Sequence, residues 1–241
     1  MKIWAHRGCS QMYPENTLLA FRQAAKIKGL TGIELDIQMT KDKHLVVCHD
    51  EKVDRTTNGI GAVKEYSLAE LKKLRIDAGN GKYEQIPTID EVLDLLEEKM
   101  LDGFKLNIEL KNSRVAYEGM EEKIIEKVHA RNIQGSVIYS SFSALSLERI
   151  RKLDAETEIG VLDSKVSDCL FKLRGGCGAN ALHPYWKGID LPPERIKGYP
   201  VRAYFGGHLY PEKPTGTKLA ITALEQKGIT DVFLNEPEQY L

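Results

Sequence analysis

Residues 32–49, GIELDIQMTKDKHLVVCH, decide the fold of this chain. The first seven alternate apolar and polar side chains as a β-strand does, and the last five form a second apolar run. Only six residues, 39–44, separate the two runs, whereas a parallel return needs roughly a dozen or more. The second run must therefore fold back as an antiparallel hairpin that turns near residues 41–43.

The hairpin predicts which side chains meet at its open end. Antiparallel partners keep a nearly constant index sum, so position 36 should lie opposite position 48. His49 is then expected beside Glu34 and Asp36, whose side chains leave the same face of the strand because they are two residues apart. An imidazole and two carboxylates are therefore predicted to share one site.

Short β-branched runs alternate with amphipathic stretches along the whole chain, which is typical of parallel strands covered by helices. The expected strands are 2–6, 32–38, 105–111, 136–140, 158–162, 179–183, 201–205 and 231–235. The expected helices are 17–28, 88–97, 120–130, 144–153, 164–172 and 218–227. This order predicts an α/β fold, a TIM-type (β/α)8 barrel, with the β-hairpin and a small insertion after the second strand.

The chain is expected to form a single domain over residues 1–241. Its 241 residues, 42% of them hydrophobic, can bury one sizeable core without disulfides. Residues 51–85 are dense in turn-forming pairs such as Asn58-Gly59 and are predicted to form an insertion on the rim of the barrel.

Charge and cysteine content exclude several classes of partner. The formal net charge is -1, so no general field attracts nucleic acid or an anionic membrane, and an anionic ligand needs a local cluster of charges. The four cysteines are far apart and are expected to be reduced thiols. The first strand starts at residue 2 and no apolar run approaches the length of a membrane span, so a cytoplasmic protein without stable membrane insertion is predicted.

Glu34 and Asp36 form the first candidate for chemistry. Two carboxylates on one face of a buried strand repel each other unless a cation lies between them, and oxygen-only ligands suit Mg²⁺, Ca²⁺ or Mn²⁺ better than zinc. The alternative is a pair of exposed acids on an edge strand. The apolar residues on both sides of each carboxylate favour a buried strand and a metal site.

Residues 107–111, NIELK, repeat this design on the next expected barrel strand. Asn107, Glu109 and Lys111 share one face. Glu109 and Lys111 can be a structural ion pair. Beside a dicarboxylate site, however, Glu109 is a candidate third ligand and Lys111 a candidate charge for a phosphoryl oxygen.

His6 and Arg7 end the first strand, where catalytic groups of barrels lie. Arginine matches two phosphate oxygens with its planar fork, and histidine transfers protons near neutral pH. A single histidine at a strand end is usually structural. With His49 brought to the same rim, two imidazoles can supply the base and the acid that phosphodiester cleavage requires.

Seven motifs in series resemble those of the glycerophosphodiester phosphodiesterases. They are His6-Arg7, Pro14-Glu15-Asn16-Thr17, Glu34-x-Asp36, His49-Asp50, Arg55-Thr56-Thr57-Asn58-Gly59, Ile86-Pro87-Thr88 and Glu109-x-Lys111. The resemblance implies a TIM-type barrel that hydrolyses glycerophosphodiesters to an alcohol and glycerol 3-phosphate, with one divalent cation, Mg²⁺ or Ca²⁺, and with Mn²⁺ as a third candidate.

The resemblance also implies roles for individual residues. The three acidic residues of the motifs, Glu34, Asp36 and Glu109, would bind the cation. His6 and His49 would be the acid and base, in an order that the sequence leaves open. The two cations Arg7 and Lys111 would hold the phosphate.

Six more residues are candidates for the substrate pocket or its support, namely Glu15, Asn16, Ser141, Phe142, His183 and Tyr204. Asp50 is expected to point away from His49 and to fix the turn. The carboxyl half departs from the family pattern at residues 204–207, YFGG, and 235–237, NEP, which leaves the released alcohol open.

Two alternative functions use the same residues. One is a phospholipase D-like lyase that converts lysophospholipids to a cyclic phosphate, and the other is a non-catalytic barrel that binds phosphoesters. The expected partner is a small-molecule glycerophosphodiester, with no nucleic acid. The sequence indicates neither the oligomeric state nor the metal used in the cell.

Overall fold

The computed structural model describes residues 1–205 and 219–241. Two expectations touch the remaining segment: Gly206 and Gly207 of the aromatic, glycine-rich stretch, and Lys218 at the expected start of the last helix, lie outside the described residues. Within the described part, no helix is long and apolar enough to cross a membrane.

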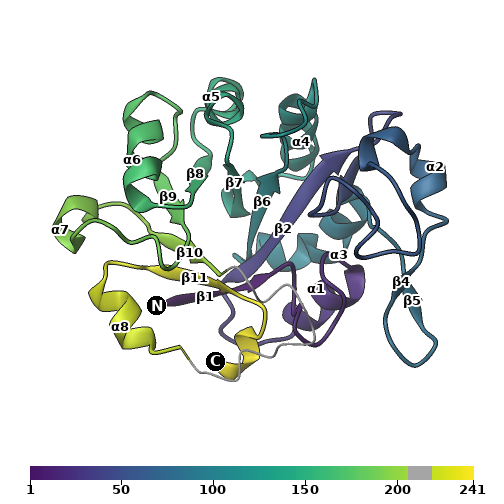
Figure 1. Ribbon diagram of the computed structural model, residues 1–241, viewed down its shortest axis with the longest axis horizontal. Helices are drawn as coiled ribbons and strands as arrows, with labels where there is room; N and C mark the ends of the chain where they lie inside the picture. Colours follow the sequence, from purple (N-terminus) through teal and green to yellow (C-terminus); the bar gives the residue numbers. More distant parts are fainter. Residues whose placement is uncertain (206–218) are drawn as a thin grey trace.

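Eight parallel strands form a nearly closed barrel, which confirms the predicted fold class (Figure 1). They are β1 (Lys2–His6), β2 (Gly32–Met39), β6 (Lys105–Leu110), β7 (Val137–Ser141), β8 (Glu158–Asp163), β9 (Ala181–Pro184), β10 (Arg202–Tyr204) and β11 (Asp231–Leu234). The order along the sheet is β10-β11-β1-β2-β6-β7-β8-β9. Two isolated parallel bridges, Leu182 with Val201 and Tyr185 with Tyr204, join β9 to β10.

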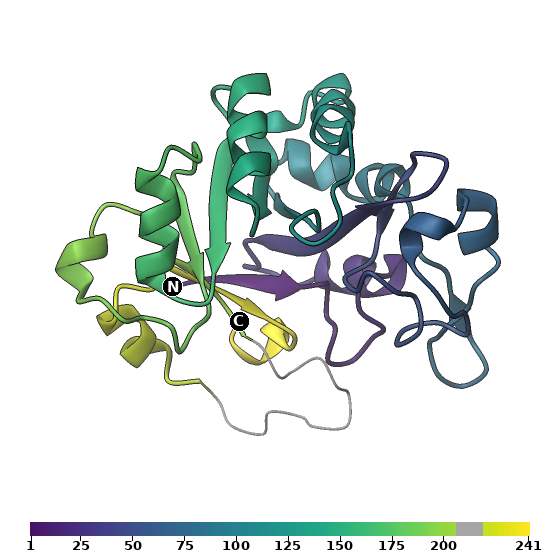
Figure 2. The ribbon, with the colours of Figure 1, turned by 45° about the horizontal axis from the view of Figure 1, so that its top comes forward.

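Helices lie outside the strands and cover the barrel (Figure 2). They are α1 (Leu18–Ala24), α3 (Ile89–Leu101), α4 (Met120–Ala130), α5 (Ala144–Leu153), α6 (Val166–Arg174), α7 (Pro193–Ile196) and α8 (Ile221–Gln226). Thr17, Thr88 and Ser143 cap α1, α3 and α5 with their hydroxyl groups, as short polar side chains at helix starts do. Apolar residues of α1, α3 and α5 belong to the same core as the outward side chains of β2, which are Ile33, Leu35 and Ile37, and α5 itself packs on β7 and β8.

The predicted hairpin is confirmed. Strand β3 (Leu45–Val47) pairs antiparallel with β2, with Ile37 opposite Val47 and Met39 opposite Leu45. The backbone N–H of Cys48 donates to the carbonyl of Asp36 over 3.1 Å, so position 36 lies opposite position 48 as the index sum required. The loop that follows β3 therefore starts beside the inward-facing acids of β2.

Residues 51–85 lie beside the barrel, next to β3, and contain short elements (Figure 1). These are η1 (Val63–Glu65), α2 (Leu68–Leu71), β4 (Ile76–Asp77) and β5 (Tyr83–Glu84). A small apolar cluster that includes Val53, Val63 and Leu71 packs them against Val46 and Cys48 of the hairpin. The β4–β5 pair and the single-turn helix α7 were not predicted, because two-residue strands and one-turn helices are too short to show a hydrophobic periodicity in the sequence.

Candidate active site

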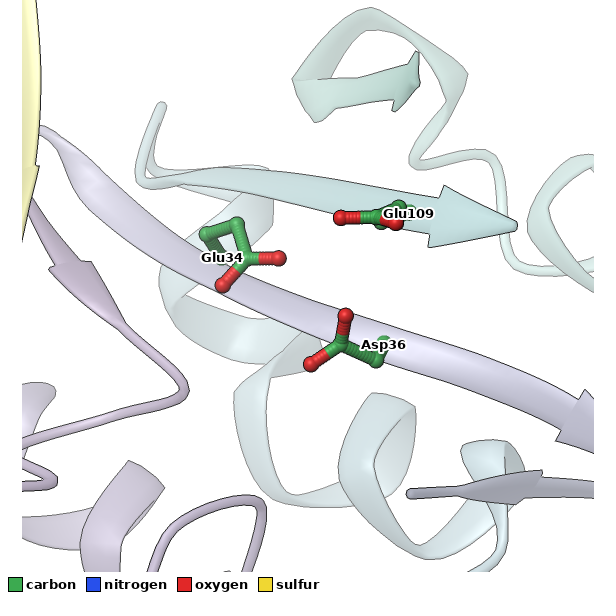
Figure 3. A group of neighbouring side chains, drawn as sticks. All are labelled: Glu34, Asp36 and Glu109. Carbon is green, nitrogen blue, oxygen red and sulfur yellow. The ribbon is translucent and has the colours of Figure 1, made fainter. Parts of the chain in front are cut away.

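Three carboxylates from two neighbouring strands meet inside the carboxyl end of the barrel (Figure 3). The parallel pairing of β2 with β6 puts Asp36 level with Glu109 and Glu34 level with Asn107. One oxygen from each of Glu34, Asp36 and Glu109 lies within 4.8 Å of the others, and all three residues are buried. The three acidic residues named from two i, i+2 patterns on separate strands thus lie together, and their binding of a cation stays a prediction.

The hydrogen bonds of the cluster leave one oxygen open for a cation. Asp36 Oδ2 accepts from Asn16 Nδ2 over 2.9 Å, whereas the buried Asp36 Oδ1 has no hydrogen-bond partner among residues 1–205 and 219–241. A buried polar atom without a partner is costly and needs an explanation. Three carboxylates with only oxygen donors suit a hard divalent cation such as Mg²⁺, Ca²⁺ or Mn²⁺, so the residues present fit such an ion.

The electrostatics of the cluster favour the same conclusion. Burial raises the pKa of Glu34, and the charges of Asp36 and Glu109 raise it further. Burial also acts to raise the pKa of Asp36, but the charges of His49, Arg7 and Lys111 hold that pKa below its ordinary value. Because like charges disfavour one another's ionisation, a cation would allow all three carboxylates to be charged together.

His6 is held by a residue from the other end of the chain. Its Nδ1 lies 2.7 Å from Asn235 Oδ1; because a carbonyl oxygen only accepts, Nδ1 donates and Nε2 keeps a free lone pair. Nε2 lies 3.8 Å from Glu34 Oε2. Burial, with the charge of Arg7 as the second cause, lowers the pKa of His6 to about 3, so the ring is neutral at neutral pH.

His49 has a different partner. Its Nδ1 lies 2.7 Å from Asp50 Oδ1, and Arg55 Nε donates to Asp50 Oδ2 over 2.7 Å. Burial acts to raise the pKa of Asp50, but the hydrogen bonds from His49 and Arg55 lower it below its ordinary value. The expectation that Asp50 points away from His49 is wrong, because β3 ends at Val47 and strand alternation no longer applies to the two residues.

Arg7 and Lys111 bring positive charge to the acids. Arg7 Nε lies 3.3 Å from Asp36 Oδ2, and its Nη1 donates to Glu15 Oε1 over 2.9 Å. Lys111 Nζ donates to Glu109 Oε1 over 2.8 Å and lies 3.8 Å from Asp36 Oδ1. These two cations offset part of the negative charge of the cluster, before any ion or phosphate binds.

A pocket joins these groups to an aromatic wall. It has about 630 Å³ of empty space, counting the part that opens to solvent, which is within the range of small-molecule sites. Its polar side is lined by His6, Arg7, Glu34, His49, Asn107, Glu109, Lys111 and Ser140, and its other side by Phe142, Leu162, His183, Tyr204, Phe205 and Phe233. Both histidines and both cations thus face one space.

The weaker candidates for the pocket divide into two groups. Phe142, His183 and Tyr204 line it. Ser141 does not line it, because alternate residues of a strand face opposite sides and Ser140 is the one that points inward. The hydroxyl of Ser141 instead donates to the carbonyl of Leu110 over 3.0 Å. Glu15 and Asn16 lie behind the pocket and contact Arg7 and Asp36.

Sequence reasoning missed two residues that hold the histidines, Asn235 and Asp50. Asp50 directly follows His49 in the sequence, and this adjacency was the signal that could have identified it as the partner of His49. Asn235 was noted only as a departure from the family pattern, and it lies 229 positions from its partner. No local pattern connects residues so far apart, so barrel closure had to be known first.

The fold and the pocket together define a TIM-barrel enzyme with its active site at the carboxyl ends of the strands. A family model for the glycerophosphoryl diester phosphodiesterase family matches residues 6–169. The chain therefore belongs to the glycerophosphodiester phosphodiesterase family, whose members are phosphoric diester hydrolases.

Individual relatives agree with this assignment. The chain is 40% identical to a glycerophosphodiester phosphodiesterase of Caldanaerobacter subterraneus subsp. tengcongensis over 98% of this chain and 94% of the relative. It is 43% identical to one of Bacillus altitudinis over 81% of this chain and 80% of the relative. Among solved structures, a phosphodiesterase of Oleispira antarctica in complex with the product sn-glycerol 3-phosphate is similar with a TM-score of 0.75 and 26% identity, over 99% of this chain and 94% of that one.

Proposed function

We propose that this protein hydrolyses glycerophosphodiesters to an alcohol and glycerol 3-phosphate, with one divalent cation bound by Glu34, Asp36 and Glu109. The observation that carries the proposal is the buried three-carboxylate cluster, with an open oxygen on Asp36 and with His6 and His49 lining the same pocket. Family membership and the product named for the Oleispira antarctica structure support the substrate class.

The cation would supply positive charge to a phosphoryl oxygen and so stabilise the negative charge that develops there. Arg7 and Lys111 add two more positive groups to the same side of the pocket. We propose that they bind the remaining phosphoryl oxygens, since a guanidinium can donate two parallel hydrogen bonds and an ammonium acts as a compact point charge. The phosphate would then lie between the two imidazoles.

The partners of the two imidazoles support different roles for them. His6 is neutral, with a free lone pair on Nε2, so we assign it as the base that takes the proton from the attacking hydroxyl, either the glycerol 2-hydroxyl or water. The Asp50 carboxylate lies against His49 Nδ1, and we assign His49 as the acid that donates a proton to the oxygen of the leaving alcohol. If the 2-hydroxyl attacks, water opens the resulting cyclic phosphate with the proton transfers reversed.

Neither of the two alternative functions has an observation in its favour. A lyase would stop at the cyclic phosphate, and a non-catalytic barrel would have no need for a buried carboxylate cluster that is costly without its cation. The cytoplasmic location and the single domain remain predictions from the sequence, which gives none for the oligomeric state.

The test is release of glycerol 3-phosphate from glycerophosphocholine or glycerophosphoethanolamine, measured with Mg²⁺, Ca²⁺ or Mn²⁺. We expect chelation and His6→Ala each to abolish the activity, while His44→Ala, at an exposed histidine in the hairpin, leaves it intact. Turnover that survives both chelation and His6→Ala contradicts the proposal. Phosphorus NMR of the products would reveal a cyclic phosphate that accumulates, as a lyase requires.

A further inference from the structure

The loop that carries His49 turns three consecutive backbone carbonyls toward one side chain. Gln38 Nε2 lies 3.0 Å from the carbonyl oxygen of Cys48, 3.2 Å from that of His49 and 2.5 Å from that of Asp50. Gln38 is fully buried. It follows Asp36 by two residues on β2, so its side chain leaves the strand on the same face as the two acids.

Three carbonyl oxygens that converge on one point repel one another unless a donor lies between them. The carboxamide of Gln38 has only two N–H groups, so the three oxygens share them. Residues 48–50 belong to no helix or strand, and apart from the weak contact of Cys48 Sγ with the carbonyl of Asp50, these three oxygens accept only from Gln38 among the hydrogen bonds of the described residues. The amide therefore determines where this loop bends.

A second residue determines which way the amide faces. The hydroxyl of Tyr117 donates to Gln38 Oε1 over 3.0 Å, so Nε2 must face the carbonyls. Tyr117 is buried and lies in the segment between Lys111 and α4. Burial raises the pKa of Tyr117 to about 12, so the hydroxyl keeps its proton and remains a donor at neutral pH.

We propose that Gln38 and Tyr117 are positioning residues that fix the His49 loop relative to the metal-binding carboxylates. Strand β2 then carries two functions on one face: Glu34 and Asp36 for the cation, and Gln38 for the imidazole. The inference rests on the proposed role of His49. It explains how a loop without secondary structure holds an imidazole beside groups on a rigid strand, a placement on which proton transfer depends because small displacements are costly.

The direct test is Gln38→Met, which keeps the approximate size of the side chain and removes both donors. We expect kcat to fall by roughly 10- to 100-fold, the range for displacements of about 1 Å, with KM nearly unchanged because the cation and phosphate groups are untouched. Gln38→Glu should reduce kcat further, because a carboxylate would face, and be repelled by, three carbonyl oxygens. Tyr117→Phe should reduce kcat less than Gln38→Met does. The amide of Gln38 remains, although its orientation is no longer fixed.

Two matched controls separate this effect from substitution in general. Gln85→Met removes a glutamine that donates to one carbonyl in the insertion, that of Lys72. Tyr139→Phe removes a buried hydroxyl that has no hydrogen-bond partner in the described part of the chain. Both controls should keep the kcat of the wild-type protein, and thermal unfolding should show every variant folded at the assay temperature.

A double-mutant cycle shows whether Gln38 acts through His49. If it does, Gln38→Met should reduce kcat in the wild-type background and have no effect in a His49→Ala background. The cycle uses glycerophosphocholine, whose leaving alcohol needs the acid, with enough enzyme to measure turnover in the slow His49→Ala background. An equal loss in both backgrounds would mean a general structural role and would overturn the inference.

Hydrogen exchange tests the loop without any activity measurement. Backbone amides of residues 48–53 should exchange faster in Gln38→Met than in the wild-type protein, and those of α4 and α5 should not change. Unchanged exchange in residues 48–53 also overturns the inference. A wild-type protein without diesterase activity, or a fully active His49→Ala, would instead contradict the proposed function, so the two failures are distinguishable.

Discussion

The two histidines of the site differ in the group that their Nδ1 atom contacts. An amide oxygen of Asn235 accepts from His6, and a carboxylate of Asp50 accepts from His49. A carboxylate stabilises an imidazolium through its charge, whereas an amide oxygen fixes only the tautomer. These two partners are the basis on which we propose His6 as the base and His49 as the acid, an order that the sequence left open.

The role of Asp50 gives a prediction at this scale. Asp50→Asn keeps the size of the side chain and removes the charge that stabilises protonated His49, so we expect kcat for glycerophosphocholine to fall by roughly 100-fold or more. A nitrophenyl diester, which needs no proton on its leaving group, should be affected much less. Steady-state kinetics on both substrates decide; equal losses would contradict the assignment of His49 as the acid.

His183 gives a second prediction, on stability. Burial, with the charge of Arg202 as the second cause, lowers the pKa of His183 well below 6.5, so the unfolded chain binds a proton in acid that the folded one does not. Stability is therefore complete above pH 6.5 and falls as the pH drops below it, by up to about 1.4 kcal/mol per pH unit for one group.

His183→Gln keeps an acceptor for Arg202, which lies 3.3 Å from His183 Nε2, and cannot be protonated. Urea unfolding of the variant at pH 7 and pH 5.5 should show a smaller loss of unfolding free energy in acid than the wild-type protein shows. The other ionisable groups are the same in both proteins, so only the difference between the two is informative. If the unfolding free energies of the two proteins depend on pH in the same way, His183 is not buried in its neutral form.

At the scale of elements, the long periodic segments were predictable and the short ones were not. The bounds of β1, α4 and α5 agree with the predicted ranges 2–6, 120–130 and 144–153. The β4–β5 pair and α7 were missed because each is held by local turns and by packing on neighbours, which leave no period in the sequence. The position of His49 was predictable because a short connection permits only one direction of return.

Thr88 shows that one of the family-like motifs is structural. Its hydroxyl and the side chain of Glu91 form a capping box at the start of α3, and neither residue lines the pocket. Thr88→Ala should lower the unfolding free energy by about 1 kcal/mol without a change in kcat. Urea unfolding and steady-state kinetics measure the two quantities, and a large loss of kcat would give Thr88 a role that its contacts do not suggest.

At the scale of the whole molecule, closure of the barrel assembles the site from both ends of the chain. The candidate cation ligands, both imidazoles and both phosphate-binding candidates lie within residues 6–111, whereas most of the aromatic wall comes from residues 142–233. The first half was predictable because its polar residues follow strand periodicity and resemble a known motif series. The second half was less predictable, because the apolar residues of a pocket wall cannot be distinguished in the sequence from those of any other buried strand.

The carboxylate cluster should make the stability of the entire fold depend on the cation. An ion that binds only the folded state at 100 times its dissociation constant adds about 2.7 kcal/mol, which for a chain of this size corresponds to a rise in Tm of roughly 5–10 °C. We expect Mg²⁺ or Ca²⁺ to raise the Tm of the wild-type protein and chelation to reverse the rise. A monovalent salt at the same ionic strength is the control.

Glu34→Gln is the matching substitution, because it removes one of three mutually repelling charges and keeps the shape of the side chain. A buried carboxyl with a raised pKa is protonated in the folded state at pH values where it is ionised in the unfolded state, so it destabilises the fold increasingly as the pH rises above about 4.5. Without a cation at pH 8, the variant should therefore unfold at a higher temperature than the wild-type protein. The cation should no longer raise its Tm. A cation-free variant less stable than the wild-type protein would mean that the hydrogen bond from the backbone N–H of Arg7 to Glu34 Oε2 outweighs the repulsion among the acids, and the cluster would then not require an ion.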